Sequence, residues 1–340
     1  MIDLNKFANF DISVVIPALN AEAYISALLK GIEAQTLLPK EIVIVDSSPT
    51  NRTAEIVQSW SGSVPIRYHK VNFAYPGDAR NIGVKAAQCR WIAFIDCRTL
   101  PTTDWLEKCS NAAYECNADV VIASRVSEAD SYFKHILCAA TTGYAAHKSL
   151  AGSLILKDFF ERSRGFISNL RNGEDIEWMQ RLESLEGRII QLPVSVIKYR
   201  GFPDKLTAAM RKWYQYSMFI MHHEIRNDQK QLYFMILIFL LFLLSVIVFK
   251  WNAVMAHWDS SSIYFVPNIT KKFVLIVLIT YILFNGVIRP LKRGVKLFFL
   301  LPWNWIVIAF VRFCLDLAKA PGLIWGNILL FKRKLSRALS

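Results

Sequence analysis

The sequence predicts an α/β domain with a mostly parallel sheet, followed by a C-terminal region that lies in a membrane. Short apolar runs alternate with helical patterns over residues 12–100, and polar residues follow the ends of several runs. The hydrophobic content of 54% is high for a soluble protein, and the excess is concentrated in residues 231–340. These observations divide the chain into an α/β domain over 1–230 and a membrane region over 231–340.

The alternation begins with residues 12–18 (ISVVIPA), a β-branched run typical of a strand buried on both faces. The elements expected after it are a helix over 22–35, a strand at 41–45, a helix around 53–60, a strand near 65–69, a helix over 78–88 and a strand at 91–95. This order is that of a parallel sheet with helices on its faces.

Polar side chains gather where these strands end. Asn20 and Glu22 follow the first strand, Asp46 ends the second, and Asp96 ends the fourth. Ligands of open α/β sheets bind outside the carboxyl ends of the strands. A single acid at such a place is often an ordinary turn or helix-capping residue. Three acids at one edge fit a ligand with hydroxyl groups and base edges, or a metal-bound phosphate.

Five motifs within residues 11–215 resemble the family 2 glycosyltransferases with a GT-A fold. In chain order they are VVIPALNAE at 14–22, EIVIVDSS at 41–48, GDARNIG at 77–83, FIDCRTLP at 94–101 and NGEDIEWMQRL at 172–182. The resemblance implies inverting transfer of a sugar from a nucleotide-sugar, with a donor half over about 1–100 and an acceptor half over about 101–215. The chain has no GxxxxGK[ST] and no GxGxxG, which argues against a P-loop or dinucleotide site.

The resemblance also implies a donor pocket at the strand ends. Pro17, Asn20 and Glu22 are expected to form the floor of the nucleoside pocket, with Glu22 accepting hydrogen bonds from ribose hydroxyls. Asp46 is expected to face the base and to accept from a ring N–H, which fits uracil, thymine or guanine. Asp96 is expected at the diphosphate and ribose, where it is also the candidate metal ligand.

Residues 96–98 depart from the family pattern. Asp96-Cys97-Arg98 stands where the family has Asp-x-Asp, whose second acid coordinates Mg²⁺ or Mn²⁺. An arginine cannot ligate a cation and repels one held nearby. Three alternatives follow: Arg98 itself supplies positive charge to the diphosphate, Asp96 alone holds the metal with phosphates and waters, or the site is inactive. Nearby, Arg80 is expected to pair with donor phosphates, or to be a surface salt-bridge arginine.

The GED motif at 173–175 begins an apparent helix and is the candidate catalytic segment. Inverting transfer needs a base that takes the proton of the acceptor hydroxyl. A carboxylate at a helix start is kept ionised by the helix dipole and by backbone N–H groups. The resemblance implies that Asp175 is the base and Glu174 its neighbour, while a helix-capping acid pair is the alternative.

Two further segments resemble acceptor-side parts of the family. Residues 151–157 (AGSLILK) resemble the strand under the acceptor, with Gly152 and Ser153 lining the pocket. The resemblance implies that residues 211–216 (RKWYQY) cover the donor or border the membrane. The same residues also fit an interfacial helix. Trp213 in this segment is expected to contact the acceptor.

Two spans and a third membrane segment are expected. Residues 232–249 are 18 uncharged and almost wholly apolar positions, close to the roughly 20 needed to cross a bilayer. Residues 273–288 form a shorter run that spans with help from flanking residues. Residues 297–311 carry Pro302, and we expect an interfacial or re-entrant segment there, with Pro321 permitting a second break; a three-span arrangement remains open.

Orientation follows from the flanking charges. No cleavable signal peptide is visible, so residues 1–230 are expected in the cytosol. The loop at 289–296 (RPLKRGVK) has four basic residues and no acid, which favours the cytosolic side, and the C-terminus is expected there too. The location expected is the bacterial inner (plasma) membrane.

Composition excludes some other classes. The net charge of +13 is not read as a nucleic-acid site, because much of the excess lies beside apolar runs, where anionic membrane lipid is the simpler partner. The six cysteines form no CxxC pair and are expected to be free, buried thiols. A transporter is disfavoured because the two predicted spans contain no charged residue.

The sequence therefore predicts a membrane-bound inverting glycosyltransferase. It takes a nucleotide-sugar donor and extends a lipid-linked or membrane-proximal glycan acceptor, in surface polysaccharide or lipopolysaccharide assembly as the family resemblance implies. The alternative, motivated by Arg98, is a degenerate GT-A domain that acts as a membrane-bound binding or scaffold protein.

Overall fold

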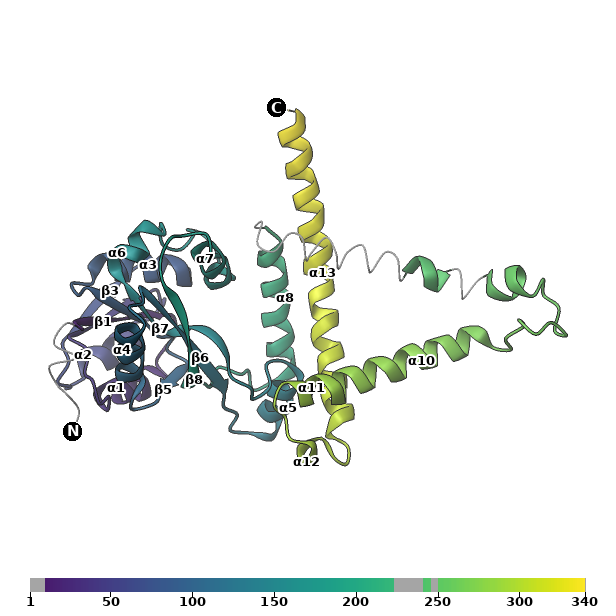
Figure 1. Cartoon of the computed structure of the whole chain (residues 1–340), viewed down its shortest axis with the longest axis horizontal. Coiled ribbons are helices and arrows are strands. Elements are labelled where there is room, and N and C mark those ends of the chain that lie inside the picture. The colour runs from purple at the N-terminus through teal and green to yellow at the C-terminus, as the bar shows by residue number, and fades with distance from the viewer. Residues whose placement is uncertain (1–9, 223–240, 246–249, 340) are drawn as a thin grey trace.

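A computed structural model describes residues 10–222, 241–245 and 250–339. One eight-stranded sheet forms the centre of the N-terminal domain, in the strand order β3-β2-β1-β4-β7-β6-β8-β5 (Figure 1). Its strands are β1 Ile12–Ala18, β2 Glu41–Asp46, β3 Ile66–Lys70, β4 Trp91–Phe94, β5 Thr99–Pro101, β6 Val120–Ser127, β7 His147–Leu156 and β8 Ile189–Tyr199.

The sheet is parallel where the sequence predicted it to be. Strands β3, β2, β1 and β4 all run in one direction, and Ala18 at the end of β1 pairs with Asp46 at the end of β2. The other half is mixed, because β7 is antiparallel to β4 and β6 while β6 and β8 are parallel. The carboxyl ends of β1, β2 and β4 therefore share one edge.

Helices cover both faces of this sheet. They are α1 Ile25–Glu33, α2 Arg52–Gln58, α3 Pro76–Ala86, α4 Trp105–Glu115, α6 Lys157–Arg162 and α7 Glu174–Leu182. Leu29 and Trp105 pack in the apolar layer under α1, α2 and α4. Phe94, Phe159 and Trp178 pack in the layer under α3, α6 and α7. Burial of these large side chains is the main favourable term in the domain's stability.

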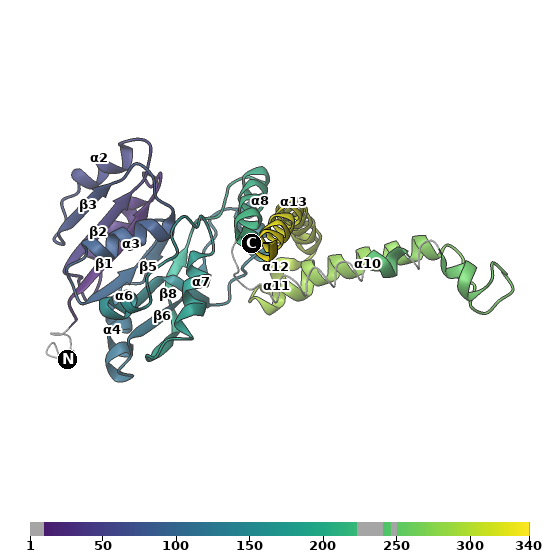
Figure 2. The ribbon, with the colours of Figure 1, turned by 90° about the horizontal axis from the view of Figure 1, so that it is seen from above.

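The rest of the chain is helical and extends from one end of the domain. Its elements are α5 Tyr132–Ala140, α8 Leu206–His222, α10 Ile269–Leu283, η2 Phe284–Ile288, α11 Arg289–Lys292, α12 Leu297–Leu300 and α13 Asn304–Leu339. Helix α13 lies beside α8 and touches α5, and Leu137, Ala209, Ile308 and Leu315 belong to the apolar cluster that they share. Figures 1 and 2 both show α10 running away from α13 on the side opposite the α/β domain.

One helix among the described residues, Ile269–Lys292, is long and apolar enough to cross a membrane. It contains the predicted span at 273–288, and most of its apolar side chains are exposed. The predicted span at 232–249 and the boundary at residue 230 lie outside the described residues, apart from 241–245, which are helical. Of the membrane spans that were predicted, the described part of the chain therefore supports one candidate helix.

The third apolar segment, 297–311, is not one helix. Helix α12 ends at Leu300, the chain turns, and α13 begins at Asn304. Pro302 lies in this turn, consistent with its lack of a backbone N–H. Pro321 does not break the chain again, because α13 continues through it. The segment from 304 onward is thus a single long helix, and not the twice-broken one that the two prolines permitted.

Gly286 sets how closely η2 and α13 approach. A Cβ atom on Gly286 would lie 2.2 Å from the backbone oxygen of Trp305. We expect Gly286→Val to separate the two helices and to lower the free energy of unfolding of the helical region by about 1–3 kcal/mol, the usual cost of overpacking. Thermal unfolding in detergent measures this effect. The matched control is Leu283→Val, at an exposed position on α10; equal unfolding midpoints for the two variants would contradict the close crossing.

Candidate active site

The strand-end residues do meet at one edge. Asn20 lies just after β1 with a positive φ of 49°, and its backbone N–H donates to Ser48 Oγ at 2.7 Å, beyond β2. Ala21 N–H donates to Thr53 Oγ1 at 3.2 Å, which ties the same loop to the start of α2. These bonds fix the loop after β1 against the loop after β2, so Asn20 is held where the donor pocket was predicted.

Asp46 lies at this edge but is wholly buried, with an exposed fraction of 0%. Its carboxylate accepts from the backbone N–H of Ser48 at 2.8 Å, from Lys70 Nζ at 3.1 Å, and from the hydroxyls of Ser48 and Tyr68. Burial acts to raise its pKa, but these hydrogen bonds hold the pKa of Asp46 below its usual value. The carboxylate is therefore ionised and already engaged on both oxygens. The contact of Asp46 with a nucleotide base stays a prediction. In that arrangement the base shares the carboxylate with Tyr68 and Lys70.

Glu22 differs from Asp46 because part of its carboxylate is unsatisfied. Its Oε2 atom is buried and has no hydrogen-bond partner. A buried carboxylate oxygen without a donor is costly, so a donor such as a ligand hydroxyl fits here. Pro17, at the end of β1, has its carbonyl oxygen within 3.4 Å of Cys97 Sγ, so it faces the segment that carries Asp96 and Arg98.

Arg80 is the centre of the site. It lies on α3 with only 6% of its side chain exposed, and it forms two ion pairs. Nη2 donates to Asp96 Oδ1 at 2.7 Å and Nη1 donates to Glu174 Oε1 at 2.9 Å. Its guanidinium carbon also lies 5.6 Å from the centre of the Phe166 ring. The structure places Arg80 inside the protein, between the end of β4 and the start of α7. The alternative of a surface salt-bridge arginine is therefore wrong, and the contact with donor phosphates stays a prediction.

Glu174 and Asp175 begin α7 after Gly173, whose φ of 88° favours glycine. Glu174 is 7% exposed, and burial raises its pKa to about 7 although Arg80 lies beside it; the neighbouring Asp175 acts in the same direction. Asp175 is half-buried, and its Oδ1 accepts from the backbone N–H of Ile176 at 2.8 Å. Glu174 therefore fixes the helix start through Arg80, while Asp175 is the more open carboxylate. Its role as base stays a prediction.

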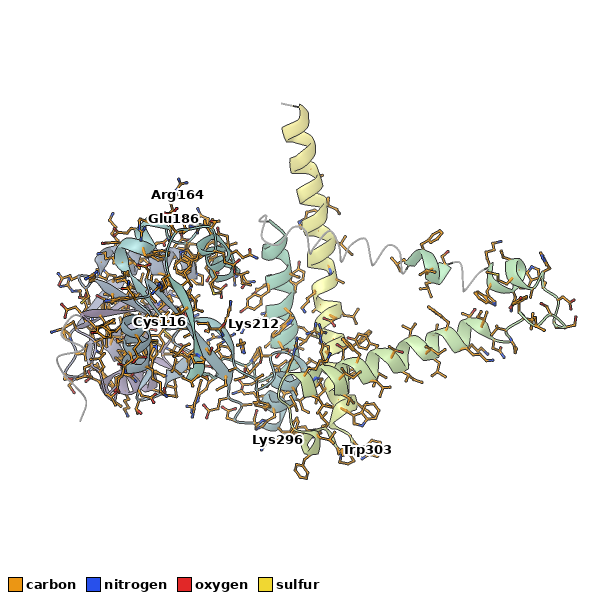
Figure 3. All side chains as sticks on the ribbon, viewed as in Figure 1. Cys116, Arg164, Glu186, Lys212, Lys296 and Trp303 are labelled. Carbon is orange, nitrogen blue, oxygen red and sulfur yellow. The ribbon has the colours of Figure 1, made fainter. Side chains whose placement is uncertain are left out.

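Two cationic side chains, Arg98 and Lys212, lie against the tyrosines Tyr24 and Tyr199. Arg98 is exposed and lies over the Tyr24 ring at 5.6 Å. Lys212, from α8, donates to the hydroxyl of Tyr199 at 3.1 Å and is close enough to Arg98 for the two charges to interact. Figure 3 shows Lys212 between α8 and the α/β domain. Sequence reasoning missed Lys212, although the basic and aromatic pattern of 211–216 pointed to its segment.

The predicted acceptor contacts are not brought to this edge. Ser153 is fully buried within β7, where its hydroxyl donates to the Ser149 carbonyl at 2.8 Å and accepts from the Ala123 N–H at 3.0 Å. Gly152 is also buried, and its carbonyl accepts from Trp105 Nε1 at 2.7 Å. The expectation that these two residues line a pocket is corrected, because both serve the interior of the sheet. Trp213 packs on the cluster that joins α8 to α5 and α13, and its contact with an acceptor stays a prediction.

The residues at 96–98 do not fit the divalent cation that the family pattern implies. Asp96 Oδ1 is engaged by Arg80, the Cys97 side chain is buried, and Arg98 brings positive charge. Burial and the neighbouring Asp96 and Asp46 carboxylates raise the pKa of the Cys97 thiol to about 12, so it is not a thiolate ligand. Within the described chain, no group of three His, Cys, Asp or Glu side chains is placed to hold a metal.

Comparison with known proteins relates the N-terminal part of this chain to glycosyltransferases. Residues 13–147 match the family model described as Glycosyl transferase family 2. This match supports a glycosyltransferase domain with a GT-A-like α/β fold, which covers β1 and reaches the start of β7.

Particular relatives are similar over parts of the chain. Poly(ribitol-phosphate) beta-N-acetylglucosaminyltransferase TarS of Staphylococcus aureus is 29% identical over 115 residues, covering 32% of this chain and 20% of that protein. Glycosyltransferase GlyA of Streptococcus pneumoniae is 26% identical over 212 residues, covering 56% of this chain and 30% of that protein. The chain thus spans less than a third of the length of these two relatives. A crystal structure of S. aureus TarS 1-349 in complex with UDP-GlcNAc has a TM-score of 0.46 at 18% identity and covers 65% of this chain and 69% of that one.

Removing Arg80 tests the buried pairing. Arg80→Met leaves Glu174 buried without its cation, and we expect the free energy of unfolding to fall by about 3–5 kcal/mol. Adding Glu174→Gln to this variant should restore part of the loss, because an amide carries neither the cost of a buried charge nor the cost of protonating a carboxyl group near neutral pH. Chemical denaturation measures all variants. The control is Arg200→Met, whose pair with Glu128 is exposed and is worth about 0–1 kcal/mol; a double variant no more stable than Arg80→Met would contradict the pairing.

Proposed function

We propose that this chain is a membrane-bound inverting glycosyltransferase, which moves a sugar from a nucleotide-sugar to a lipid-linked or membrane-proximal glycan. The observation that carries this proposal is the Asp96–Arg80–Glu174 chain of ion pairs. It joins the strand edge where ligands of α/β sheets bind to the helix start that carries Asp175. A donor site and a candidate base are thereby held next to one another by a rigid buried contact.

The donor half of the proposal rests on the unsatisfied acceptor at the strand edge. The buried Oε2 of Glu22 suits a ribose hydroxyl as its missing donor. Asn20 and Asp46 stand at the same edge, tied together through Ser48. UDP-GlcNAc is bound by the TarS fragment named above, and a nucleotide-sugar of this general kind is the donor class proposed here.

In the proposed reaction, Asp175 accepts the proton of the acceptor hydroxyl while that oxygen attacks the anomeric carbon of the donor sugar. The new carbon–oxygen bond forms as the bond to the diphosphate breaks, and the nucleoside diphosphate leaves with the electron pair. Attack from the face opposite the leaving group inverts the configuration. Arg80 and Glu174 act as positioning residues, because their ion pair fixes the start of α7.

We propose that Arg98 and Lys212 supply the positive charge for the departing diphosphate. Arg98 follows Asp96 by two residues and lies over the Tyr24 ring, Lys212 contacts Tyr199, and the donor set at 96–98 does not fit a metal ion. A guanidinium and an ammonium placed where negative charge develops stabilise a transition state as a metal does. Of the three alternatives that the sequence left open, the engagement of Asp96 by Arg80 favours this one.

In the proposed arrangement, membrane attachment brings the acceptor glycan to the active site. The exposed apolar helix Ile269–Lys292 is the proposed anchor, and α8 and α13 lie between it and the α/β domain (Figure 2). A lipid-borne or membrane-proximal glycan then reaches the site beside α8. We propose the cytosolic face of a bacterial inner membrane as the location and surface polysaccharide or lipopolysaccharide assembly as the setting, on the charge of the loop at 289–296 and the family match.

A second candidate is a domain that binds a nucleotide-sugar without turnover, acting as a membrane-bound binding or scaffold protein. Two observations favour it: the full engagement of Asp46 and the pairing of Asp96 with Arg80. Hydrolysis or transfer of a nucleotide-sugar by the purified chain separates the two candidates.

The base assignment predicts a large effect at one position. We expect Asp175→Asn to lower the rate of sugar transfer about 100- to 10,000-fold, because the amide cannot accept the hydroxyl proton. Donor affinity, measured separately by thermal shift, should change little. Glu183→Gln, at the exposed far end of α7, is the control and should keep its rate. Transfer by Asp175→Asn near the wild-type rate would remove Asp175 from the mechanism.

The charge assignment predicts independence from metal. We expect the wild-type transfer rate to survive EDTA, and Arg98→Gln or Lys212→Gln to lower it about 100-fold, the usual effect of losing one group that stabilises transition-state charge. Arg98→Asp should acquire a requirement for Mg²⁺ or Mn²⁺. The control is Arg200→Gln, a neighbouring arginine that faces Glu128. Loss of wild-type activity in EDTA, with recovery on adding Mg²⁺, would refute the assignment.

A further inference from the structure

A basic and aromatic cluster lies at the same edge of the sheet as the candidate active site, but in the other half of the sheet. Arg125 is near the carboxyl end of β6, Tyr199 ends the parallel strand β8, and His147 begins the antiparallel strand β7 opposite Arg125. Because β7 is also antiparallel to β4, its first residues lie beyond the carboxyl end of β4. The cluster therefore occupies the edge at which ligands of such sheets bind.

Two contacts fix the side chain of Arg125. Its Nε atom donates to His147 Nε2 at 2.9 Å, and its guanidinium carbon lies 4.7 Å from the centre of the Tyr199 ring. The Nδ1 atom of His147 then carries the proton and donates to the Ala145 carbonyl at 3.3 Å. Burial and the charge of Arg125 lower the pKa of His147, so the imidazole stays neutral and Nε2 remains an acceptor.

This arrangement leaves the two Nη atoms of Arg125 for a ligand. Among the described residues, neither Nη atom has a hydrogen-bond partner and no carboxylate forms an ion pair with Arg125. A guanidinium that is held through Nε and through one face presents its outer nitrogens as a fixed fork, which matches two oxygens of an oxyanion. Because the orientation is set before binding, a ligand loses little affinity to side-chain ordering.

A second cation stands at the hydroxyl end of Tyr199. Lys212 Nζ donates to this hydroxyl at 3.1 Å, and the hydroxyl itself donates to the Gly201 carbonyl at 2.9 Å. One tyrosine thus contacts both Arg125 and Lys212. Lys212, like Arg125, has no ion pair with a carboxylate in the part of the chain that the structure describes. Two half-buried cations without a counter-ion suit a doubly charged anion better than a single carboxylate.

Aromatic side chains border the cluster on the side of the helical region. Lys212 Nζ lies 5.6 Å from the centre of the Tyr216 ring, and the Tyr216 and Trp213 rings are 6.3 Å apart. Tyr199 and Trp213 also pack against the apolar cluster of α5, α8 and α13. Figure 3 shows Lys212 between α8 and the α/β domain. A ligand that combines an anionic group with an apolar chain therefore meets matching groups on both sides.

We propose that Arg125, with Lys212 beside it, binds the phosphate group of a lipid-linked acceptor. His147 and Tyr199 are positioning residues, because they hold the Arg125 fork in place. The inference rests on the proposed function and adds the chemical class of the acceptor, a sugar joined to its lipid through a phosphate ester. Lys212, assigned above to the donor diphosphate, then lies between the two anionic groups and reduces their repulsion.

Binding of an alkyl phosphate by the full chain in detergent tests the proposal. The calorimetric probes are octyl phosphate, octanol, inorganic phosphate and UDP. We expect octyl phosphate to bind more tightly than octanol or inorganic phosphate, because each of these lacks one half of the ligand. Arg125→Gln should weaken octyl phosphate binding about 10- to 100-fold, the usual effect of losing hydrogen bonds from a charged group. Its affinity for UDP should equal that of the wild type, which also shows that the variant is folded.

Two further variants separate the fork from the charge. Arg125→Lys keeps the charge without the fork, and we expect an intermediate loss of about 3- to 10-fold. His147→Gln should bind octyl phosphate nearly as the wild type does, because the amide oxygen can still accept from Arg125 Nε, whereas His147→Leu should bind it more weakly. The matched control is Lys198→Gln, which removes an exposed charge next to Tyr199 on β8 and should keep wild-type affinity.

Equal losses in Arg125→Gln and Lys198→Gln would overturn the site, because they would show general attraction to charge. Octanol or inorganic phosphate binding as tightly as octyl phosphate would overturn the assignment to a lipid-linked phosphate. A parallel loss of UDP affinity in Arg125→Gln would place Arg125 at the donor instead and would also overturn it. Sugar transfer is measured separately: transfer without octyl phosphate binding contradicts this inference alone, and binding without transfer contradicts the proposed function alone.

Discussion

Arg80 joins three elements that lie far apart in the sequence, through ion pairs of 2.7 Å to Asp96 and 2.9 Å to Glu174. The pair with Glu174 is buried on both sides and is weakened little by water, whereas Asp96 is 38% exposed. Without this contact, the start of α7 has no polar link to the strand edge, and Asp175 loses its fixed place. The geometry of the candidate site therefore depends on one buried cation, with Asp96 as one of its two partners.

The same pairing explains why the site tolerates an arginine at position 98. Once Arg80 occupies Asp96, a cation bound there would meet both guanidinium groups, and repulsion would oppose it. In the proposed mechanism, positive charge at the diphosphate therefore comes from the side chains of Arg98 and Lys212. Lys212 belongs to α8, outside the family-matched residues 13–147. Under this proposal the helical region contributes a cation to the candidate site.

Local patterns predicted the parallel half of the sheet well. The run at 12–18 coincides with β1, because a β-branched strand buried on both faces leaves a continuous apolar signature. Contacts between distant residues left no such signature. The pairing of Arg80 with Glu174 joins positions 94 apart, and the burial of Ser153 follows from its neighbours in three strands. Similarly, Pro321 suggested a break in the helix. Helix α13 instead continues through Pro321 and packs on α8.

The helices α8 and α13 lie between the α/β domain and the exposed apolar helix Ile269–Lys292. Lys212 on α8 faces the α/β domain, whereas Arg312 and Lys319 on α13 face the anchor, and the apolar cluster around Ala209 and Ile308 fastens the two helices together. A packed pair of this kind transmits position rigidly. If the anchor spans the bilayer, the candidate site is held at a set height above the phosphate level. The acceptor proposed above, a lipid-linked or membrane-proximal glycan, would then have to present its hydroxyl just beyond the headgroups.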